Sequence, residues 1–557
     1  MRVYSYYDQL RRLSADEVYD GMLGFGMFSN TVPESLNSRS FLKYCKVNSK
    51  KLPQKSCCDW IRYRHTRNID QFREFGIPNP FSYERLVYTI KDNWRDILDY
   101  FKKQTAQWKY KVSRIHIRKI LTSKTIFQMN YGEAPIGTNI PSRAVFNMNY
   151  KNFIEDDNPL PELLLGKKYL VKADISRCFP SIYTHSIEWA AVTKRVAKIR
   201  HNKSKVKKSK SNLKKSWDML LDTNLRNTTY GETHGVLIGP HSSNLISEII
   251  LTAIDNKMYE EGYRYIRYVD DYSCYVESLE KANDFINDLD SELQEYGLAI
   301  NQKKIKIIEL PEQSESNWTN KLTRFLLKQR LDYSDVKAFF DFAIETMKEN
   351  DSNKAILLYA LKILSKKKMN SNAKKYYIDF GFYLLSLYPY LVPYADELFL
   401  LNSEINRDKL QWLLSIIYRR GLEKRDYLTS VFALHYACKH SVRISFLDKN
   451  LLAHDISDAD FDEILNSKDC LLMLFAWLYS QENIISGIQD SYTAKLNGLS
   501  IRLRNQALEY VQDYNDFERN WVFVYQVLTE QEIPDKDLYY SYWRDLKKSK
   551  VSFVDSY

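Results

Sequence analysis

Residues 265–276 constrain this chain more than any other stretch. They read Tyr-Ile-Arg-Tyr-Val-Asp-Asp-Tyr-Ser-Cys-Tyr-Val, with Asp270 and Asp271 between two short runs of β-branched and aromatic residues. Such runs fit a pleated surface and an Asp-Asp pair tolerates a tight turn, so the pattern predicts a β-hairpin. Adjacent carboxylates repel each other unless a cation lies between them, and Mg2+ prefers such oxygen ligands. Because an isolated Asp-Asp turn is usually just solvated, a metal site requires a third carboxylate.

A third carboxylate follows a second strand-like run, in residues 169–182. This stretch reads Tyr-Leu-Val-Lys-Ala-Asp-Ile-Ser-Arg-Cys-Phe-Pro-Ser-Ile, so an apolar run leads into Asp174 and an aromatic residue, Phe179, follows. The apolar run predicts a buried strand that ends at the carboxylate. We therefore expect Asp174 to meet Asp270 and Asp271 at the end of one sheet.

These residues resemble the palm of reverse transcriptases. Asp174 matches the carboxylate of the first palm motif, and Asp270 with Asp271 matches the Tyr-x-Asp-Asp motif. Phe179 falls where those enzymes keep an aromatic residue that crowds the sugar 2′ position. Residues 183–189, Tyr-Thr-His-Ser-Ile-Glu-Trp, are similar to a string in the abortive-infection (Abi-type, AbiK-like) bacterial reverse transcriptases. The resemblance covers roughly residues 60–310.

The resemblance implies a site for phosphoryl transfer, a reaction that depends on positioning and charge neutralisation. Two Mg2+ ions about 4 Å apart, or Mn2+ in their place, can hold the attacking 3′-oxygen, the transferred phosphate and the pyrophosphate. Asp174 and Asp270 are expected to bridge both ions. Asp271 is expected to assist from the turn, and Ile175 to contribute its carbonyl. Phe179 would favour deoxynucleotides by leaving no room for a 2′-hydroxyl.

Three arginines are candidates for binding the triphosphate of a nucleotide. Residues 113–119 place cations at alternating positions, including Arg114 and Arg118, as a strand with one charged face would. Arg143 precedes another strand-like run. Arginine on fingers strands is what a triphosphate clamp requires. Solvated strand charges are an equally good interpretation of each arginine taken singly.

Between the two carboxylate motifs, Gly235, Gly239 and Ser243 precede or begin a predicted helix. Two glycines four positions apart permit close backbone approach to a planar ligand, and the resemblance implies that this segment positions the nucleotide. The resemblance also places Lys304, of an Asn-x-x-Lys string, near the departing pyrophosphate; a basic strand end is the alternative. Template-copying reverse transcriptases usually carry Pro-Gln-Gly where residues 236–238 read Val-Leu-Ile.

The length of 557 residues predicts two or three domains. The expected fold class is α+β, with a right-hand polymerase fingers and palm domain followed by an all-α domain of HEAT-like helical repeats. The expected boundaries are 1–165 for an N-terminal extension and the fingers, 166–316 for the palm and 317–557 for the helical repeats. Helical spacing of apolar residues predicts one helix over residues 84–104 and another over residues 279–296. Beyond residue 317 apolar residues recur at helical spacing, as in an α-solenoid. His435, Cys438 and His440 are expected to have core and surface roles.

The net charge of +11 is carried by one segment. Residues 194–215 hold eleven Lys or Arg and no acid, so the rest of the chain has no net charge. From residue 201 to residue 213 we expect a flexible, solvated loop that either contacts nucleic acid or only aids solubility. No apolar run reaches the ~18 residues of a spanning helix, and the N-terminus lacks an apolar signal core. These features predict a cytoplasmic protein without a membrane partner, and its seven cysteines are expected to be reduced.

The resemblance implies template-independent DNA synthesis from dNTPs, primed by a protein hydroxyl, in defence against phage. The single-stranded DNA product would stay covalently attached, RNA is a further candidate partner, and a homo-oligomer (trimer or hexamer) is expected. The 42 tyrosines leave the priming residue unknown. The nearest alternative is a template-copying RNA-directed DNA polymerase of retron or group II intron type. A palm-fold nucleotide cyclase would carry a Gly-Gly-Asp-Glu-like turn, which is missing, and a non-catalytic helical scaffold would not require three carboxylates.

Overall fold

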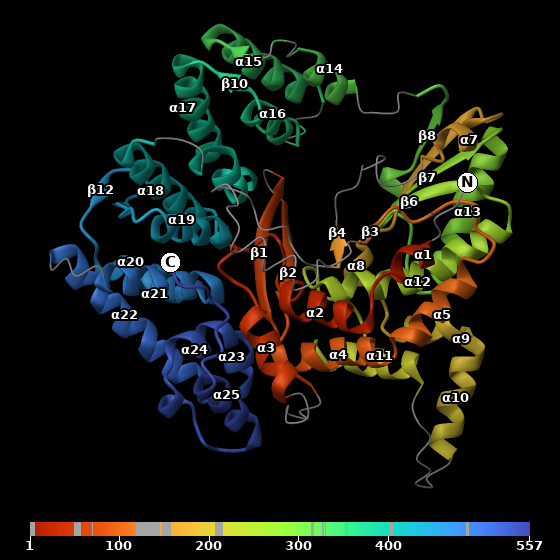
Figure 1. The fold of residues 1–557 in the computed structure, drawn as a ribbon, viewed down its shortest axis with the longest axis horizontal. Helices are drawn as coiled ribbons and strands as arrows, with labels where there is room; N and C mark the ends of the chain where they lie inside the picture. Colours follow the sequence, from red (N-terminus) through yellow and green to blue (C-terminus); the bar gives the residue numbers. More distant parts are fainter. Residues whose placement is uncertain are drawn as a thin grey trace.

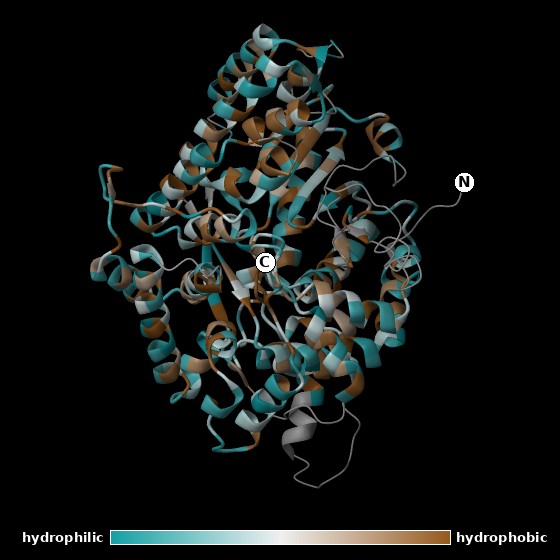
Figure 2. Cartoon of the chain, turned by 60° about the vertical axis from the view of Figure 1, so that its left-hand side comes forward, coloured by the Kyte–Doolittle hydropathy of each residue, from teal (hydrophilic) through white to brown (hydrophobic). Residues whose placement is uncertain are grey.

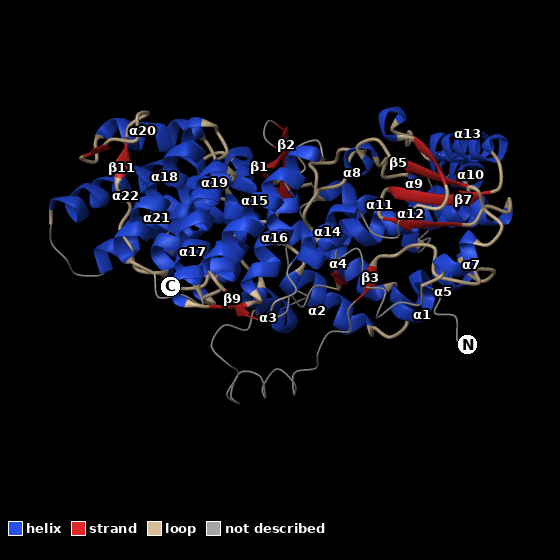
Figure 3. Ribbon diagram, turned by 90° about the horizontal axis from the view of Figure 1, so that it is seen from above, coloured by secondary structure: helices blue, strands red, loops and turns tan. Residues whose placement is uncertain are grey.

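Four antiparallel strands form a sheet at one end of the computed structural model (Figures 1 and 3). Their order is β6 (Tyr265–Tyr268), β7 (Asp271–Val276), β5 (Tyr169–Asp174) and β8 (Lys306–Glu309). The predicted hairpin is confirmed, because β6 and β7 pair antiparallel and Val269 with Asp270 forms the turn between them. The pairing of β5 with β7 sets Asp174 opposite Asp271.

The structure describes residues 6–48, 57–68, 71–117, 145–147, 158–206, 216–312, 317–325, 328, 330–350, 353, 355–401, 405–485 and 490–557. None of the helices in these ranges is long and apolar enough to cross a membrane.

Helices pack against the palm sheet. The helix predicted to begin at residue 279 is present as α13 (Leu279–Glu295), and its buried residues are spaced three or four apart, as expected of an amphipathic helix. The ring of Phe285 on this helix lies 5.8 Å from that of Tyr265 on β6. The long helix α12 (His241–Glu260) is buried along most of its length. The same region contains α7 (Leu160–Leu164), α8 (Cys178–Ser181), α9 (Ser186–Val192), α11 (Trp217–Asn227) and the 3-10 helix η2 (Gln302–Lys304).

The basic segment differs from the prediction of a loop that begins at residue 201. Helix α10 (Lys194–Val206) continues through these residues and projects from the body (Figure 1). Lysine and arginine are good helix formers, and without glycine or proline nothing in this stretch ends the helix. The break from α9 lies earlier, at Thr193, whose φ is +73°. The rest of the predicted loop, residues 207–215, lies outside the described residues.

The N-terminal region combines helices with one long hairpin. β1 (Ile61–Asn68) and β2 (Gln71–Ile77) pair antiparallel. The single helix predicted for residues 84–104 is two helices, α4 (Pro80–Asp92) and α5 (Trp94–Gln104). They break at Asn93, since asparagine competes for backbone hydrogen bonds and favours helix ends. The remaining elements are α1 (Tyr6–Leu10), α2 (Ala15–Phe25), α3 (Arg39–Asn48), β3 (His116–Ile117) and β4 (Phe146–Asn147).

The described residues beyond 317 are mostly helical, and their helices show hydrophobic and hydrophilic faces (Figure 2). They comprise α14 (Asn317–Phe325), α15 (Tyr333–Glu349), α16 (Ala355–Ser365), α17 (Ser371–Leu387), η3 (Pro389–Tyr394), η4 (Asp396–Leu400), α18 (Arg407–Glu423), α19 (Tyr427–Lys439), α20 (Asp458–Ser467), α21 (Cys470–Ile485), α22 (Ser491–Tyr510), α23 (Tyr514–Arg519), α24 (Trp521–Val527), η5 (Glu530–Glu532) and α25 (Leu538–Lys548).

The expectation that this half is all helical is wrong in detail. β9 (Arg330–Leu331) pairs parallel with β10 (Lys368–Met369), and β11 (Phe446–Leu447) pairs antiparallel with β12 (Ala453–His454). Strands of two residues are too short to produce an alternating pattern in the sequence, so they could not be predicted.

The last helices of the chain pack beside α3 of the N-terminal region (Figure 1). The ring of Phe553 lies 5.5 Å from that of Phe41 on α3, and Trp543 on α25 lies 4.9 Å from Phe81 on α4. The backbone N–H of Asn37 donates to the backbone carbonyl of Phe553 at 3.0 Å. One continuous cluster of buried apolar residues therefore includes residues of the N-terminal region, the palm and the helical half.

Removing the Phe553 side chain tests this closure. Phe553 is fully buried and also packs against Trp521, at 4.8 Å between ring centroids. We expect Phe553→Ala to lower the free energy of unfolding by about 3–5 kcal/mol, because it leaves a cavity between the two ends of the chain. Urea unfolding followed by tryptophan fluorescence measures this change. Leu538→Ala, at an exposed position of α25, is the control and should change stability by no more than ~0.5 kcal/mol. A loss below about 1 kcal/mol for Phe553→Ala would contradict the packing described.

Candidate active site

Three carboxylates from two distant parts of the chain meet where β5 ends and β7 begins. Oxygens of Asp174, Asp270 and Asp271 all lie within 4.8 Å of one another. Backbone bonds fix this arrangement, because Ile175 N donates to the Asp270 carbonyl at 3.1 Å and Asn301 N donates to the Asp174 carbonyl at 2.7 Å. The sheet register and these backbone hydrogen bonds therefore bring together the residues that the sequence predicted as a group.

Burial and neighbouring charge raise the pKa of two of the three carboxylates. Loss of surrounding water, and next the charge of Asp174, raises the pKa of Asp270, while the charges of Arg73 and Lys304 oppose this rise without outweighing it. Desolvation, and next the charge of Asp270, raises the pKa of Asp271 to about 6. Clustered acids whose ionisation is disfavoured are stabilised by a cation placed among them.

Side chains already partner one of the three acids. Lys304 Nζ lies 2.8 Å from Asp174 Oδ1, and Asn301 Nδ2 donates to Asp174 Oδ2 at 3.0 Å. The sequence pointed to Lys304 as a contact for pyrophosphate; in this structure its ammonium group forms an ion pair with a carboxylate of the cluster. Asn301, the first residue of the same Asn-x-x-Lys string, holds Asp174 through both its side chain and its backbone.

The carboxylate cluster fits a hard divalent cation. Three carboxylates supply the oxygen ligands that Mg2+ and Mn2+ prefer, and their mutual repulsion is the feature that a cation would relieve. The carbonyl of Ile175 is a further candidate ligand, and this residue is buried directly after Asp174.

Of the two predicted glycines, Gly235 lies beside α8, which carries Phe179, and Gly239 lies against β2. Phe179 lies on α8, five residues after the end of β5, and its carbonyl accepts a hydrogen bond from Val236 N at 2.9 Å. Gly235 has φ +87°, and a Cβ there would come within 3.3 Å of the Pro180 carbonyl oxygen. Gly239 has φ +131°, and a Cβ there would come within 3.2 Å of the Gly76 carbonyl oxygen. The close approach predicted for a planar ligand is thus made by protein backbone at both glycines.

Ser243 is buried in the first turn of α12. It lines a tightly packed region that also contains Tyr83 and Leu225. The structure therefore surrounds Ser243 with protein side chains, and its predicted contact with a nucleotide stays a prediction.

The predicted arginines are only partly described. Arg118 and Arg143 lie outside the described residues. Arg114 was expected on the exposed face of a strand, and this is wrong: it is buried, and its backbone N donates to the Arg267 carbonyl at 2.8 Å. Residues 113 and 114 add to the edge of the palm sheet beside β6, which takes this stretch away from the surface. Arg73 on β2, whose charge acts on Asp270, was not predicted; its place in a hairpin rich in arginine was the available signal.

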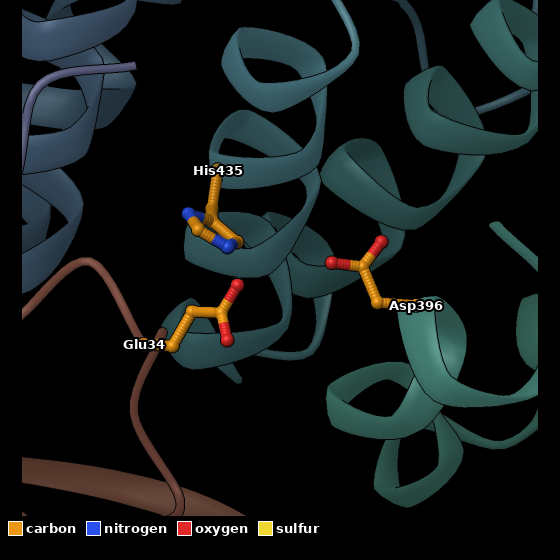
Figure 4. Close-up of side chains that lie close together, drawn as sticks. All are labelled: Glu34, Asp396 and His435. Atoms are coloured by element: carbon orange, nitrogen blue, oxygen red, sulfur yellow. The ribbon is translucent and has the colours of Figure 1, made fainter. Parts of the chain in front are cut away.

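Among the described residues, two other clusters could be taken for metal sites. Glu34, Asp396 and His435 converge in Figure 4, but the ammonium group of Lys439 contacts both carboxylates, at 2.6 Å for Asp396. His435 Nδ1 lies 2.8 Å from the hydroxyl of Tyr557, and burial lowers the pKa of this histidine to about 3. A lysine therefore already balances these acids.

The second cluster is His185, which directly precedes α9, Glu188 on α9 and Asp222 on α11. His185 Nδ1 lies 2.9 Å from Asp222 Oδ2, and Arg226 Nη2 donates to the same oxygen at 3.2 Å. Burial opposes ionisation of Asp222, but these partners outweigh it and lower its pKa. This carboxylate thus already has an arginine and a histidine as partners.

An antiparallel sheet with three carboxylates at one strand end, backed by helices, is the arrangement that the sequence predicted for a polymerase palm. Residues 102–333 match the family model described as reverse transcriptase (RNA-dependent DNA polymerase). The chain therefore contains a reverse transcriptase domain, which makes it a nucleotidyltransferase of the DNA polymerase type.

Comparison with solved structures finds weak likeness to telomerases. Apo telomerase from Candida tropicalis is 14% identical, over 72% of this chain and 70% of that chain, with a TM-score of 0.27. Telomerase from Candida albicans, solved with the TWJ fragment of telomeric RNA, is 12% identical over 71% and 69%, with a TM-score of 0.24. These scores carry no conclusion about this chain. No curated protein matches it.

The raised pKa of Asp271 makes a prediction about stability and pH. The folded-state pKa of about 6 lies above the ordinary value of 3.8. Protonated Asp271 therefore contributes stability at low pH, and this contribution is lost as pH rises through about 6. We expect metal-free Asp271→Asn to be more stable than wild type at pH 7.5, by up to about 1 kcal/mol because water screens this exposed group. The difference should vanish near pH 4.

Urea unfolding in chelator at both pH values measures this difference. Saturating Mg2+ should reverse its sign at pH 7.5, because only the wild type keeps the full set of ligands. A difference that does not depend on pH would show that Asp271 ionises normally and would contradict the electrostatic account.

Proposed function

We propose that this protein is a DNA polymerase that uses dNTPs without a template, primes synthesis from one of its own hydroxyl groups and acts in cytoplasmic antiphage defence. The observation that carries the polymerase part is the meeting of Asp174, Asp270 and Asp271 at one end of the palm sheet. Template independence and protein priming rest on the resemblance to the Abi-type enzymes and on the surroundings of residues 236–238.

The proposed roles follow from where each side chain lies. Asp174, Asp270 and Asp271 would hold two Mg2+ or Mn2+ ions, which supply charge neutralisation for the 3′-oxygen and the phosphates. Lys304 lies beside Asp174, and its ammonium can turn to the departing pyrophosphate once a metal ion takes the carboxylate. The charge of Arg73, on the fingers hairpin, acts on Asp270. Among the described residues of that hairpin, Arg73 is therefore the best placed to bind the triphosphate. Phe179 would abut the sugar.

Residues 236–238 support template independence. Val236 and Leu237 are buried, and the Ile238 carbonyl accepts from Gly76 N at 2.9 Å. A Cβ at Gly76 would come within 2.8 Å of the Leu237 side chain, so the fingers hairpin rests directly on this segment. Template-copying enzymes usually carry Pro-Gln-Gly at these positions. In this chain the positions hold apolar residues, which pack against the proposed fingers hairpin. The template-copying alternative is favoured by the description of the matching family model.

Further parts of the proposal follow from the resemblance alone. The helices beyond residue 317 are proposed to be HEAT-like repeats that support a homo-oligomer, a trimer or a hexamer. A single-stranded DNA product covalently attached to the chain is proposed, with RNA as a further partner. Gly235, Gly239 and Ser243 are proposed to support the nucleotide indirectly, through the packing of the segment that lies below it.

The carboxylate assignment is tested by removing two charges together. We expect Asp270→Asn with Asp271→Asn to reduce nucleotide incorporation by at least about a thousandfold, because the metal ions lose most of their anionic ligands. Incorporation of labelled dNTPs with Mg2+ measures this, and circular dichroism shows whether the variant folds. Asp284→Asn, at an exposed aspartate of α13, is the control and should retain full activity. Retained incorporation by the folded double variant would refute the site.

Protein priming and template use are tested in one assay. The purified protein is incubated with each labelled dNTP separately, with and without an RNA template, and is then denatured and resolved on a gel. The proposal predicts label that migrates with the polypeptide without a template and moves after protease treatment. Label that always runs free of the polypeptide, and appears only with template and primer, would favour the template-copying enzyme.

A further inference from the structure

A buried network of charged side chains around Arg267 connects the turn that carries Asp270 to α12. The Arg267 side chain is fully buried, and each N–H of its guanidinium has an acceptor. Nη1 donates to Glu248 Oε1 at 2.8 Å and to the Val269 carbonyl at 2.7 Å. Nη2 donates to Glu248 Oε2 at 3.2 Å and to Asp255 Oδ2 at 2.6 Å, and Nε donates to Asp255 Oδ2 at 2.9 Å.

The network ties the turn to the central helix. Glu248 and Asp255 are both fully buried on α12, two helical turns apart on one side of it. Asp255 Oδ1 also accepts from the hydroxyl of Tyr265 on β6, at 2.8 Å. Four buried polar side chains therefore form one connected set, and such a set is rigid only while every member has its partners.

Val269, whose carbonyl Arg267 binds, has an unusual backbone conformation. Its φ is +55°, in the left-handed region that β-branched residues avoid. Without a restraint, this residue would relax toward a negative φ, and the peptide that leads into Asp270 would rotate with it. The hydrogen bond from Arg267 Nη1 acts on the carbonyl of that same peptide.

We propose that Arg267 is a positioning residue for the metal site: it holds Val269 in the left-handed conformation and so keeps the Asp270 carboxylate beside Asp174. The proposal rests on the proposed function, because it assigns a purpose to the same carboxylates. Arg267 touches no reacting atom, and its effect passes through the backbone of the turn. Lysine cannot replace it, since one ammonium group cannot bind two carboxylates and reach the carbonyl in the geometry of the fork.

The test compares Arg267→Lys, Val269→Gly and the double variant. Mn2+ binding to the full-length protein, followed by electron paramagnetic resonance, reports on the site without requiring catalysis. We expect Arg267→Lys to weaken Mn2+ binding by at least about tenfold, in the range found when supporting partners of metal ligands are removed. Incorporation of dNTPs should fall by at least as much. Adding Val269→Gly to the Arg267→Lys variant should restore binding to within about threefold of wild type, because glycine adopts positive φ without cost.

The rescue separates positioning from general support of the fold. Glycine at position 269 removes the backbone strain but cannot repair a buried network, so a structural role alone predicts no recovery. A folded Arg267→Lys variant with unchanged Mn2+ binding, or a loss that glycine does not restore, would overturn the proposal. If Arg267→Lys does not fold, the Val269→Gly variant alone decides. Because Arg267 is still present, the turn should stay fixed, and the variant should bind Mn2+ within about threefold of wild type. A loss of Mn2+ affinity above about tenfold would overturn the proposal.

Failure of the proposed function gives a different result. A wild-type protein that binds Mn2+ but incorporates no dNTP would contradict the polymerase and leave the metal-binding comparison intact. The two inferences can therefore fail separately.

Discussion

Three like charges held within a few ångströms of one another are the constraint on which the rest of the site depends. The pairing of β5 with β7 places Asp174 opposite Asp271, and the hairpin turn adds Asp270. Left alone, these carboxylates repel each other, and this repulsion adds to desolvation in raising the pKa of Asp271. Every polar contact described around them reduces that repulsion or opposes the movement it would cause. Lys304 pairs with Asp174, and Arg267 fixes the turn from the side of α12.

The helical half of the chain contributes to this site through the hairpin of β1 and β2. β1 is joined to α19 by the hydrogen bond from Thr66 to Asp426, and the segment before it is joined to α23 by the pair of Asp59 with Arg519, at 2.6 Å. The hairpin carries Arg73, whose charge acts on Asp270, and Gly76, which bonds to Ile238. The C-terminal helices thus help to set the position of a cation whose charge acts on Asp270.

The sequence predicts those parts of the protein in which pattern and geometry are local. The hairpin at Asp270 and the helix from residue 279 follow from alternation and helical spacing, and both are present. The long helix expected through residue 104 breaks at Asn93, where a local preference of one residue outweighs the period. Arg114 looked exposed by alternation but is buried, because a strand edge distant in sequence covers it. Arg267 gave no signal of its own, since its partners lie on α12, and only the fold brings them together.

The central claim is that the three carboxylates form one metal site for nucleotidyl transfer, and crystals soaked with Mn2+ and a non-hydrolysable dNTP analogue test it most directly. The account predicts anomalous density between Asp174 and Asp270, with metal–oxygen distances of about 2.1–2.2 Å. It also predicts the triphosphate beside that density. Metal density only at another cluster, or a nucleotide bound away from the end of β5, would contradict it.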